Sequence, residues 1–283
     1  MVKAQTKGQK TAFIIVFIVF LIYSISLIYP FIWMFLNSFK MDVDFRADSF
    51  GLPSRWIFAN YFDAITHVHK GANLLVMFFH SVMNVVIICI PGQFFAACTS
   101  YILSKYRFKL NKLIFNVALV IMVIPGIGST AATFQLWHDL GIYDTYFSLF
   151  LMGGGGFGSG FLLLYSTFST LSWTYAEAAF IDGASNFRTF MQIMLPQVFP
   201  VMFSLFIISA IGTWNDYYTP YMYLPTKPTI AVGLFEIEAN ALAQQIYPMF
   251  FALMLVATAP VLLLFIMMQN TIMENVTAGG IKG

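Results

Sequence analysis

The chain has 283 residues, of which 59% are hydrophobic and 9% are charged, and its formal net charge is +2. Charged residues make up about a quarter of an ordinary soluble domain, so this composition excludes a protein whose main solvent is water. It indicates an integral membrane protein, and the small net charge gives no reason to expect a nucleic acid partner.

Six intervals without Asp, Glu, Lys or Arg are long enough to cross a bilayer, which needs about 20 apolar helical residues. Because hydrocarbon offers no partner to open backbone groups, each interval is expected to be a helix, and runs of this length exclude a transmembrane β-barrel. The predicted fold is therefore all-α, a single membrane domain with six transmembrane helices. The spans lie at approximately 11–36, 74–103, 113–136, 146–171, 197–218 and 246–270.

The basic residues between the spans predict the orientation, because Lys and Arg favour the cytoplasmic side. With the N-terminus inside, most of them are cytoplasmic: Lys3, Lys7, Lys10, Lys105, Arg107, Lys109, Lys112, Arg188 and Lys282. Acidic residues then outnumber basic ones in the external segments. Both termini are therefore expected in the cytoplasm.

The longest external segment, residues 37–70, separates the first two spans. It has mixed charges and several interfacial residues: Pro53, Trp56, Tyr61 and Phe62. This composition predicts an ordered cap at the membrane interface. His67 and His69 lack a third ligand, so no metal site is predicted, and Cys89 and Cys98 are interpreted as packing residues of the second span.

The spans contain helix breakers, namely Pro30, Pro91-Gly92, Pro125-Gly126, Pro200 and Pro260. The fourth span also holds a run of glycines: Gly153, Gly154, Gly155, Gly156, Gly158 and Gly160. One interpretation of this run is close helix packing through small residues. The other is a locally open helix that lines a polar path, with Gly153, Gly156 and Gly160 as candidates.

Ionisable residues are almost absent from the spans, and His80 and Asp216, the nearest candidates, lie close to predicted outer ends. Carriers coupled to protons or sodium usually keep such groups inside the membrane. Energy for transport is therefore expected to come from outside this chain. The chain itself has no phosphate-binding Gly-x-x-x-x-Gly-Lys-Ser/Thr motif, so it is not expected to hydrolyse ATP or act as an enzyme.

A cytoplasmic loop at residues 172–196 joins the fourth and fifth spans and has the pattern of helix, turn, helix. Gly183 can end the first helix, Ser185 can cap the second, and Pro196 is expected to stop it before the membrane. Phe187 and Phe190 follow at helical spacing on one face. An exposed helical segment with an apolar face indicates a docking element.

The same loop resembles the "EAA" motif of permease subunits of binding-protein-dependent ABC importers. That motif reads Glu-Ala-Ala, three residues, Gly, nine residues, Ile, one residue and Leu-Pro. Every fixed position is matched here, by Glu177, Ala178, Ala179, Gly183, Ile193, Leu195 and Pro196.

The resemblance extends over nearly the whole chain and is closest to the second, smaller permease of carbohydrate importers of the maltose type. Segments that carry it are Ser100 to Phe108, Trp214-Asn215-Asp216 and Thr277 to Gly283. Two features depart from the pattern, the glycine run and Glu274-Asn275 before the tail. The first departure puts in doubt any transfer of sugar-contacting positions from relatives.

The resemblance implies that the loop docks into a cytoplasmic ATPase subunit. Glu177 would pair with a basic residue of that subunit, Gly183 would make the turn after Asp182, and Phe187 and Phe190 would pack in the cleft. Thr277 to Gly283, the end of the C-terminal tail at residues 271–283, would reach between two ATPase subunits that bind ATP and magnesium. A second permease and an extracellular or periplasmic solute-binding protein would complete the assembly in the bacterial plasma membrane.

Residues near the outer end of the fifth span combine rings and short polar groups, as sugar sites do. The candidates for the substrate path are Trp214, Asn215, Asp216, Tyr217 and Tyr221. An interfacial aromatic belt is the alternative interpretation of the rings.

Three other functions are weighed against sugar import. A permease of the same architecture for a peptide, phosphate or polyamine is the nearest one, but the Trp-Asn-Asp segment and the Thr-Ala-Gly-Gly tail favour sugar. An intramembrane enzyme would need a nucleophile or metal motif, and neither Gly-x-Ser-x-Gly nor His-Glu-x-x-His is present. A secondary carrier is disfavoured by the lack of intramembrane charge.

Overall fold

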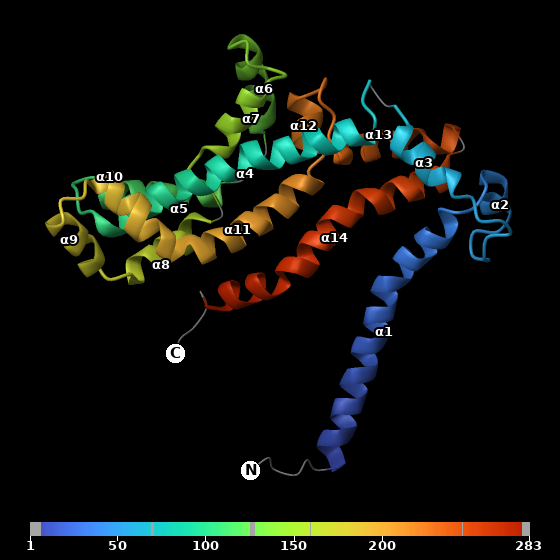
Figure 1. The fold of residues 1–283 in the computed structure, drawn as a ribbon, viewed down its shortest axis with the longest axis horizontal. Helices are drawn as coiled ribbons and strands as arrows, with labels where there is room; N and C mark the ends of the chain where they lie inside the picture. The colour runs from blue at the N-terminus through green and yellow to red at the C-terminus, as the bar shows by residue number, and fades with distance from the viewer. Residues whose placement is uncertain (1–6, 69–70, 125–127, 159, 245, 279–283) are drawn as a thin grey trace. The chain divides into compact units, whose positions relative to one another are not determined.

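The computed structural model of the chain describes residues 7–68, 71–124, 128–158, 160–244 and 246–278. These residues form fourteen α-helices and one π-helix and contain no β-strand (Figure 1). The all-α prediction is therefore confirmed for the described part of the chain. The residues divide into two compact units, which are described separately.

The first unit comprises Met1–His67 and Glu236–Ala259. It contains α1 (Lys7–Asn37), α2 (Asp42–Ala47), α3 (Ala59–Thr66) and part of both α13 (Ile230–Gln244) and α14 (Tyr247–Ala278). Large apolar side chains are exposed along most of α1, from Phe13 to Ile32. Near its end, the Trp33 ring meets the Phe251 ring edge to face at 5.3 Å.

Residues 37–67 of this unit form an ordered cap, as their composition predicts. The Phe39 ring lies 5.1 Å from each of the rings of Trp56, Phe58 and Tyr61. Lys40 is only 1% exposed, and its Nζ donates a hydrogen bond to the Asp48 carbonyl oxygen at 2.7 Å.

Backbone groups also hold the Asp48 carboxylate of this cap. The N–H groups of Gly51 and Phe50 both donate to Asp48 Oδ1 at 2.9 Å. These bonds, together with the nearby Lys40 charge, lower the pKa of the Asp48 carboxyl, because they favour its ionised form.

The second unit comprises Val68–Phe235 and Pro260–Gly283 and is organised around α4 (Leu74–Lys105). Its other helices are α5 (Asn111–Val123), α6 (Ser129–Asp139), α7 (Tyr146–Gly153), α8 (Phe161–Thr170), α9 (Thr174–Ile181), α10 (Asn186–Thr189), η1 (Phe190–Met194), α11 (Leu195–Asn215) and α12 (Tyr218–Tyr223). Helix α4 packs against α7, α8 and α11. Buried Ala96 and Ala97 let the neighbouring helices approach α4 closely.

Asn111 closes the basic turn after α4. Its Nδ2 donates hydrogen bonds to the carbonyl oxygens of Leu103 at 3.0 Å and Tyr106 at 2.8 Å. These two bonds satisfy carbonyls that the end of a helix leaves without partners. The turn therefore holds a fixed shape at the start of α5.

Among the described residues, four helices are long and apolar enough to cross a membrane: Gly8–Asn37, Leu74–Lys105, Asn186–Asn215 and Tyr247–Gln269. The intervals 113–136 and 146–171 are not single helices, contrary to the prediction. The first divides into α5 and α6, and Pro125 and Gly126 lie outside the described residues. The second divides into α7 and α8 at the glycine run.

The glycine run contains a close helix contact at Gly153 and an open segment after it. A Cβ added at Gly153 would lie 2.5 Å from the Ile88 carbonyl oxygen, so α7 and α4 touch through their backbones. Beyond Gly153 the helix opens, and Gly156 has a φ of +66° that side chains rarely allow. Thr99 Oγ1 donates to the Gly156 carbonyl oxygen at 2.7 Å and so stabilises the open segment.

Helix α14 continues to Ala278, beyond the predicted end of the sixth span at residue 270. The first part of the predicted C-terminal tail is therefore helical. Residues 279–283, which complete the tail, lie outside the described residues.

Candidate functional site

The loop between α8 and α11 has the helix, turn and helix that the sequence predicts. Gly183 ends α9 with a φ of +81°, and its N–H donates to the Phe180 carbonyl oxygen at 3.0 Å. The next N–H, of Ala184, donates to the Ala179 carbonyl oxygen at 2.9 Å. Ser185 then caps α10, since its Oγ accepts the Arg188 N–H at 3.3 Å.

Pro196 does not end the second helix of the loop, and this part of the prediction is wrong. Helix α10 continues through the π-helix η1 into α11, which gives one apolar helix from Asn186 to Asn215. The π-helix ends where the Leu195 N–H bonds to the Phe190 carbonyl oxygen. Pro196 follows in the first turn of α11, where its missing N–H is tolerated. The loop is thus continuous with a membrane-length helix.

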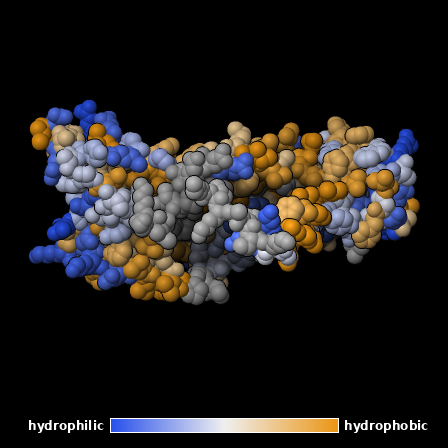
Figure 2. All heavy atoms as spheres, turned by 90° about the horizontal axis from the view of Figure 1, so that it is seen from below, coloured by the Kyte–Doolittle hydropathy of each residue, from blue (hydrophilic) through white to orange (hydrophobic). Residues whose placement is uncertain are grey.

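The tip of the loop presents apolar and acidic side chains outward. Ile181 is 86% exposed and Phe187 is 69% exposed, next to the exposed carboxylates of Glu177 and Asp182. On the left of Figure 2, hydrophilic residues gather at the end of the second unit where α9 and α10 lie. Ile181 was not predicted from the sequence as a residue of the docking surface. Its position directly before Asp-Gly at the end of a helix was the signal that could have identified it.

Phe190 does not belong to this exposed surface, contrary to the expectation that it packs in a partner's cleft. It is 5% exposed, and its ring lies 4.9 Å from the Tyr101 ring and 6.4 Å from the Phe168 ring. The reason is that this part of the loop packs against α4 and α8, so Phe190 and Met194 complete the core there.

The remaining motif residues divide between surface and interior. Ala178, Gly183, Ile193 and Pro196 are exposed, Leu195 is half-buried, and Ala179 is buried. Ala179 lies where α9 packs against η1. A small side chain is needed at that position because the two helical segments are in contact.

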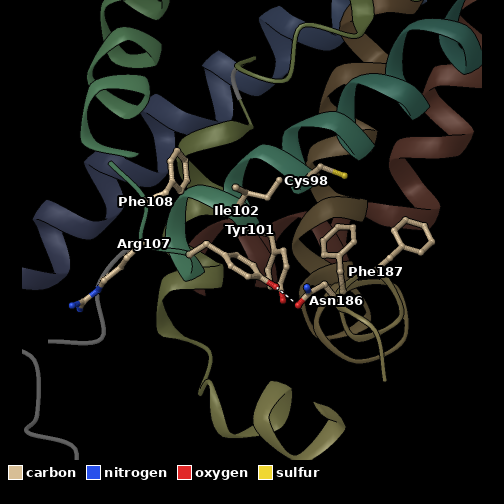
Figure 3. A pocket seen from close by; sticks show the side chains of 9 residues that line it. Cys98, Tyr101, Ile102, Arg107, Phe108, Asn186 and Phe187 are labelled. Atoms are coloured by element: carbon tan, nitrogen blue, oxygen red, sulfur yellow. Dashed lines mark hydrogen bonds between the residues drawn. The ribbon is translucent and has the colours of Figure 1, made fainter. Parts of the chain in front are cut away.

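Two motifs that are far apart in the sequence meet at the base of the loop (Figure 3). The Tyr106 hydroxyl donates to Asn186 Oδ1 at 3.2 Å, and Lys105 Nζ donates to the Leu171 carbonyl oxygen at 2.6 Å. A mainly apolar pocket of about 580 Å³ lies between them, lined by Cys98, Tyr101, Ile102, Tyr106, Arg107, Phe108, Asn186, Phe187 and Phe190. The end of α4 therefore anchors the loop.

A second pocket, of about 410 Å³, lies at the break between α7 and α8 and is called the glycine pocket below. It is lined by Ile88, Cys89, Gly92, Gln93, Ala96, Met152, Gly153, Gly155, Gly156, Gly158, Gly160, Ser209, Gly212, Thr213 and Asp216. The structure therefore brings together four candidates for the substrate path, the three glycines and Asp216.

The polar side chains of the glycine pocket come from α4 and α11. Gln93 Nε2 donates to Ser209 Oγ at 3.3 Å, and the Cys89 thiol lies 3.4 Å from Thr213 Oγ1. Gln93, Ser209 and Thr213 were not predicted as site residues from the sequence, and Cys89 was interpreted as a packing residue. Polar side chains spaced by four residues within the apolar run, as Ser209 and Thr213 are, were the available signal.

The other candidates for the substrate path do not line the glycine pocket. The Trp214 ring meets the Phe78 ring at 5.5 Å and lines a separate apolar pocket of about 260 Å³. The Tyr217 ring stacks on Phe235 at 4.4 Å, and Tyr221 meets the same ring at 5.7 Å. Asn215 Nδ2 donates to the Ile211 carbonyl oxygen at 2.9 Å, within its own helix.

Long apolar helices joined by an exposed helical loop define a multi-pass membrane protein. Residues 96–272 match the family described as "Binding-protein-dependent transport system inner membrane component". The chain belongs to this family and is a multi-pass protein of the bacterial plasma membrane, a permease of the ABC transporter class. The resemblance seen in the loop is confirmed.

Several relatives are similar over almost their whole length. A diacetylchitobiose uptake system permease protein of Streptomyces coelicolor is 31% identical over 92% of this chain and 85% of its own. A maltodextrin transport system permease protein of Bacillus subtilis is 30% identical over 92% of both chains.

A solved structure has the same fold. It belongs to a bacterial ABC transporter involved in the import of the acidic polysaccharide alginate, and one of its chains superposes with a TM-score of 0.81. The match covers 94% of this chain and 98% of that chain at 19% sequence identity.

Proposed function

We propose that this chain is a pore-forming subunit of an ABC importer that moves a carbohydrate into the cell. The names of its relatives support a sugar, since they specify diacetylchitobiose, maltodextrin, galactooligosaccharides, and melibiose, raffinose and stachyose. The observation that carries the transport mechanism is the continuous helix Asn186–Asn215, which joins the exposed loop to the glycine pocket.

The exposed tip is the surface that receives force from the motor. Ile181 and Phe187 fit an apolar cleft, and the carboxylates of Glu177 and Asp182 fit a basic rim around it. A helix of this length extends about 45 Å at 1.5 Å per residue, enough to cross the bilayer. When the ATPase pair closes, movement of the tip shifts the whole helix as a rigid body and changes access to the path.

In this proposal the partners supply what the chain does not. Two cytoplasmic ATPase subunits bind ATP and magnesium, a second permease completes the pore, and a solute-binding protein delivers the sugar. The helix pairs α5 with α6 and α7 with α8 complete the third and fourth of six spans, and both termini are cytoplasmic. The exposed apolar surface of α1 faces lipid or the second permease.

Transport by the reconstituted complex tests the proposal. The chain is co-expressed with the permease, ATPase and binding-protein genes that neighbour its own, and the complex is placed in proteoliposomes. Uptake of diacetylchitobiose, maltotriose, raffinose and melibiose is compared with that of a dipeptide, spermidine and phosphate. ATP-driven uptake of one of the sugars is expected, and uptake of only a non-sugar would overturn the carbohydrate assignment.

A charge reversal tests the role of the loop. Glu177→Lys is expected to leave the protein inserted in the membrane but to reduce ATPase binding and uptake. Asp63→Lys, at an exposed position in the external cap, is the matched control. Wild-type uptake by the Glu177→Lys complex would contradict the assignment of the loop.

A further inference from the structure

We infer that the glycine pocket is a subsite, carried by this chain itself, for one neutral sugar ring. The inference rests on the proposed function and adds where a ring binds and which rings are selected. The pocket volume of about 410 Å³ lies within the range of small-molecule sites, roughly 300–1,000 Å³.

The pocket is formed by the chain itself, because side chains of α4 donate hydrogen bonds to backbone carbonyl oxygens at the break in the glycine run. Thr99 Oγ1 donates to the Gly156 carbonyl oxygen at 2.7 Å, and Ser100 Oγ donates to the Phe161 carbonyl oxygen at 3.0 Å. The break is therefore a built feature of the fold rather than a frayed helix. Since glycines form one wall, a flat ligand can approach the backbone itself.

The polar groups in the pocket match the hydroxyls of a sugar. Gln93 Oε1 is a buried acceptor without a hydrogen-bond partner among the described residues. This oxygen is covered in the structure, so the Gln93 amide has to rotate before a ligand hydroxyl can pair with it, and that pairing would remove the cost of an unsatisfied buried acceptor. Ser209 and Thr213 add hydroxyls that both donate and accept, on the side of the pocket formed by α11.

The charge in the pocket selects against acidic sugars. Asp216 contributes a carboxylate to the glycine pocket, and its Oδ1 accepts the Thr219 N–H at 3.1 Å. No Lys, Arg or His occurs among the residues that line this pocket. A ligand carboxylate or phosphate would meet a like charge and no compensating cation. A neutral ring, whose hydroxyls can donate to Asp216, avoids this repulsion.

Gly155 offers a way to fill the pocket without disturbing its walls. A Cβ added at Gly155 meets nothing within 4 Å, whereas one added at neighbouring Gly153 would strike the backbone of Ile88. Gly155→Leu therefore occupies space in the pocket and leaves the helix contact between α7 and α4 intact. Gly8→Leu, at another glycine with open space around it, is the matched control outside the pocket.

Uptake kinetics of the complete complex in proteoliposomes give the first test. With the transported sugar of the panel above, Gly155→Leu is expected to raise KM by about tenfold or more, while ATPase subunits still co-purify in the normal ratio. Gln93→Leu is expected to act in the same direction, because it removes the amide but keeps a similar shape. Gly8→Leu is expected to behave as the wild type.

Chemical protection gives a direct binding readout. The complex carrying Gly155→Cys, with Cys89→Ser and Cys98→Ser to remove both natural thiols, is treated with a small methanethiosulfonate reagent in the absence of ATP. Saturating transported sugar is expected to slow the modification, whereas glucuronate and spermidine are expected to leave its rate unchanged.

The outcomes distinguish failure of the subsite from failure of the proposed function. If the wild-type complex takes up no sugar, the proposed function and the subsite both fall. If it takes up sugar while Gly155→Leu and Gln93→Leu keep a wild-type KM, the subsite alone falls. Protection by spermidine or glucuronate instead of the sugar would also overturn the inference, because the pocket would then bind a charged ligand.

Discussion

Replacing Phe190 with alanine distinguishes a ring that holds the loop on the membrane helices from a ring that meets the ATPase. The side chain is 5% exposed and is surrounded by the rings of Tyr101, Phe168 and Phe94. Removing a buried phenylalanine costs about 3–5 kcal/mol through lost contacts and the cavity left behind. A loss of at least about 3 kcal/mol is therefore expected.

Phe187 provides the matched comparison three residues earlier. It is 69% exposed, so Phe187→Ala is expected to change stability by less than about 0.5 kcal/mol. Its loss is expected to weaken ATPase binding by about tenfold, as truncating an exposed aromatic anchor at an interface does.

Thermal unfolding and co-purification separate the two roles. The isolated chain in detergent is heated while tryptophan fluorescence is followed, with Trp173 at the start of the loop as one of five reporters. At about 2–4 °C per kcal/mol, Phe190→Ala is expected to lower the midpoint by about 6 °C or more. An unchanged midpoint for Phe190→Ala, together with lost ATPase binding, would refute the placement of this ring in the core.

Three further changes test other contacts. Ile181→Asp is expected to reduce co-purification of ATPase subunits about tenfold. The unfolding midpoint is expected to stay the same, because Ile181 is 86% exposed. Normal co-purification would show that Ile181 is not part of the docking surface. Gly153→Ala is expected to destabilise the chain by about 1–3 kcal/mol, since the added carbon would lie 2.5 Å from the Ile88 carbonyl oxygen. Gly155→Ala, where the added carbon meets nothing within 4 Å, is expected to be tolerated. Equal unfolding midpoints for the two variants would contradict the close approach of α7 to α4. Asn111→Ala removes two hydrogen bonds to the carbonyls at the end of α4 and is expected to cost about 1–2 kcal/mol, measured by the same unfolding assay.

Apolar length and local backbone chemistry made much of this structure predictable. The long charge-free intervals located the four membrane-length helices, and Gly183 and Ser185 marked the turn between α9 and α10, because both signals depend only on nearby residues. The ordered cap followed from its aromatic residues for the same reason.

Features that depend on distant parts of the chain could not be predicted. Phe187 and Phe190 have the same spacing signal, but only the packing of the loop on α4 and α8 decides that one ring is buried. The glycine run gave two interpretations, and only the three-dimensional structure shows that Gly153 touches α4 while the helix opens at Gly156. Gln93 is remote in sequence from Ser209, so their shared pocket has no local signature.

The π-helix η1 takes up one extra residue between the loop and α11. Each residue of an α-helix turns the chain by about 100°, and a π-turn accommodates one extra residue without that rotation. Deleting one residue from Phe190–Met194 would therefore restore a regular α-helix and leave the tip that carries Ile181 facing the same side. The direction in which the tip faces is thus protected at η1 against a one-residue change in chain length, independently of the chemistry of the tip itself.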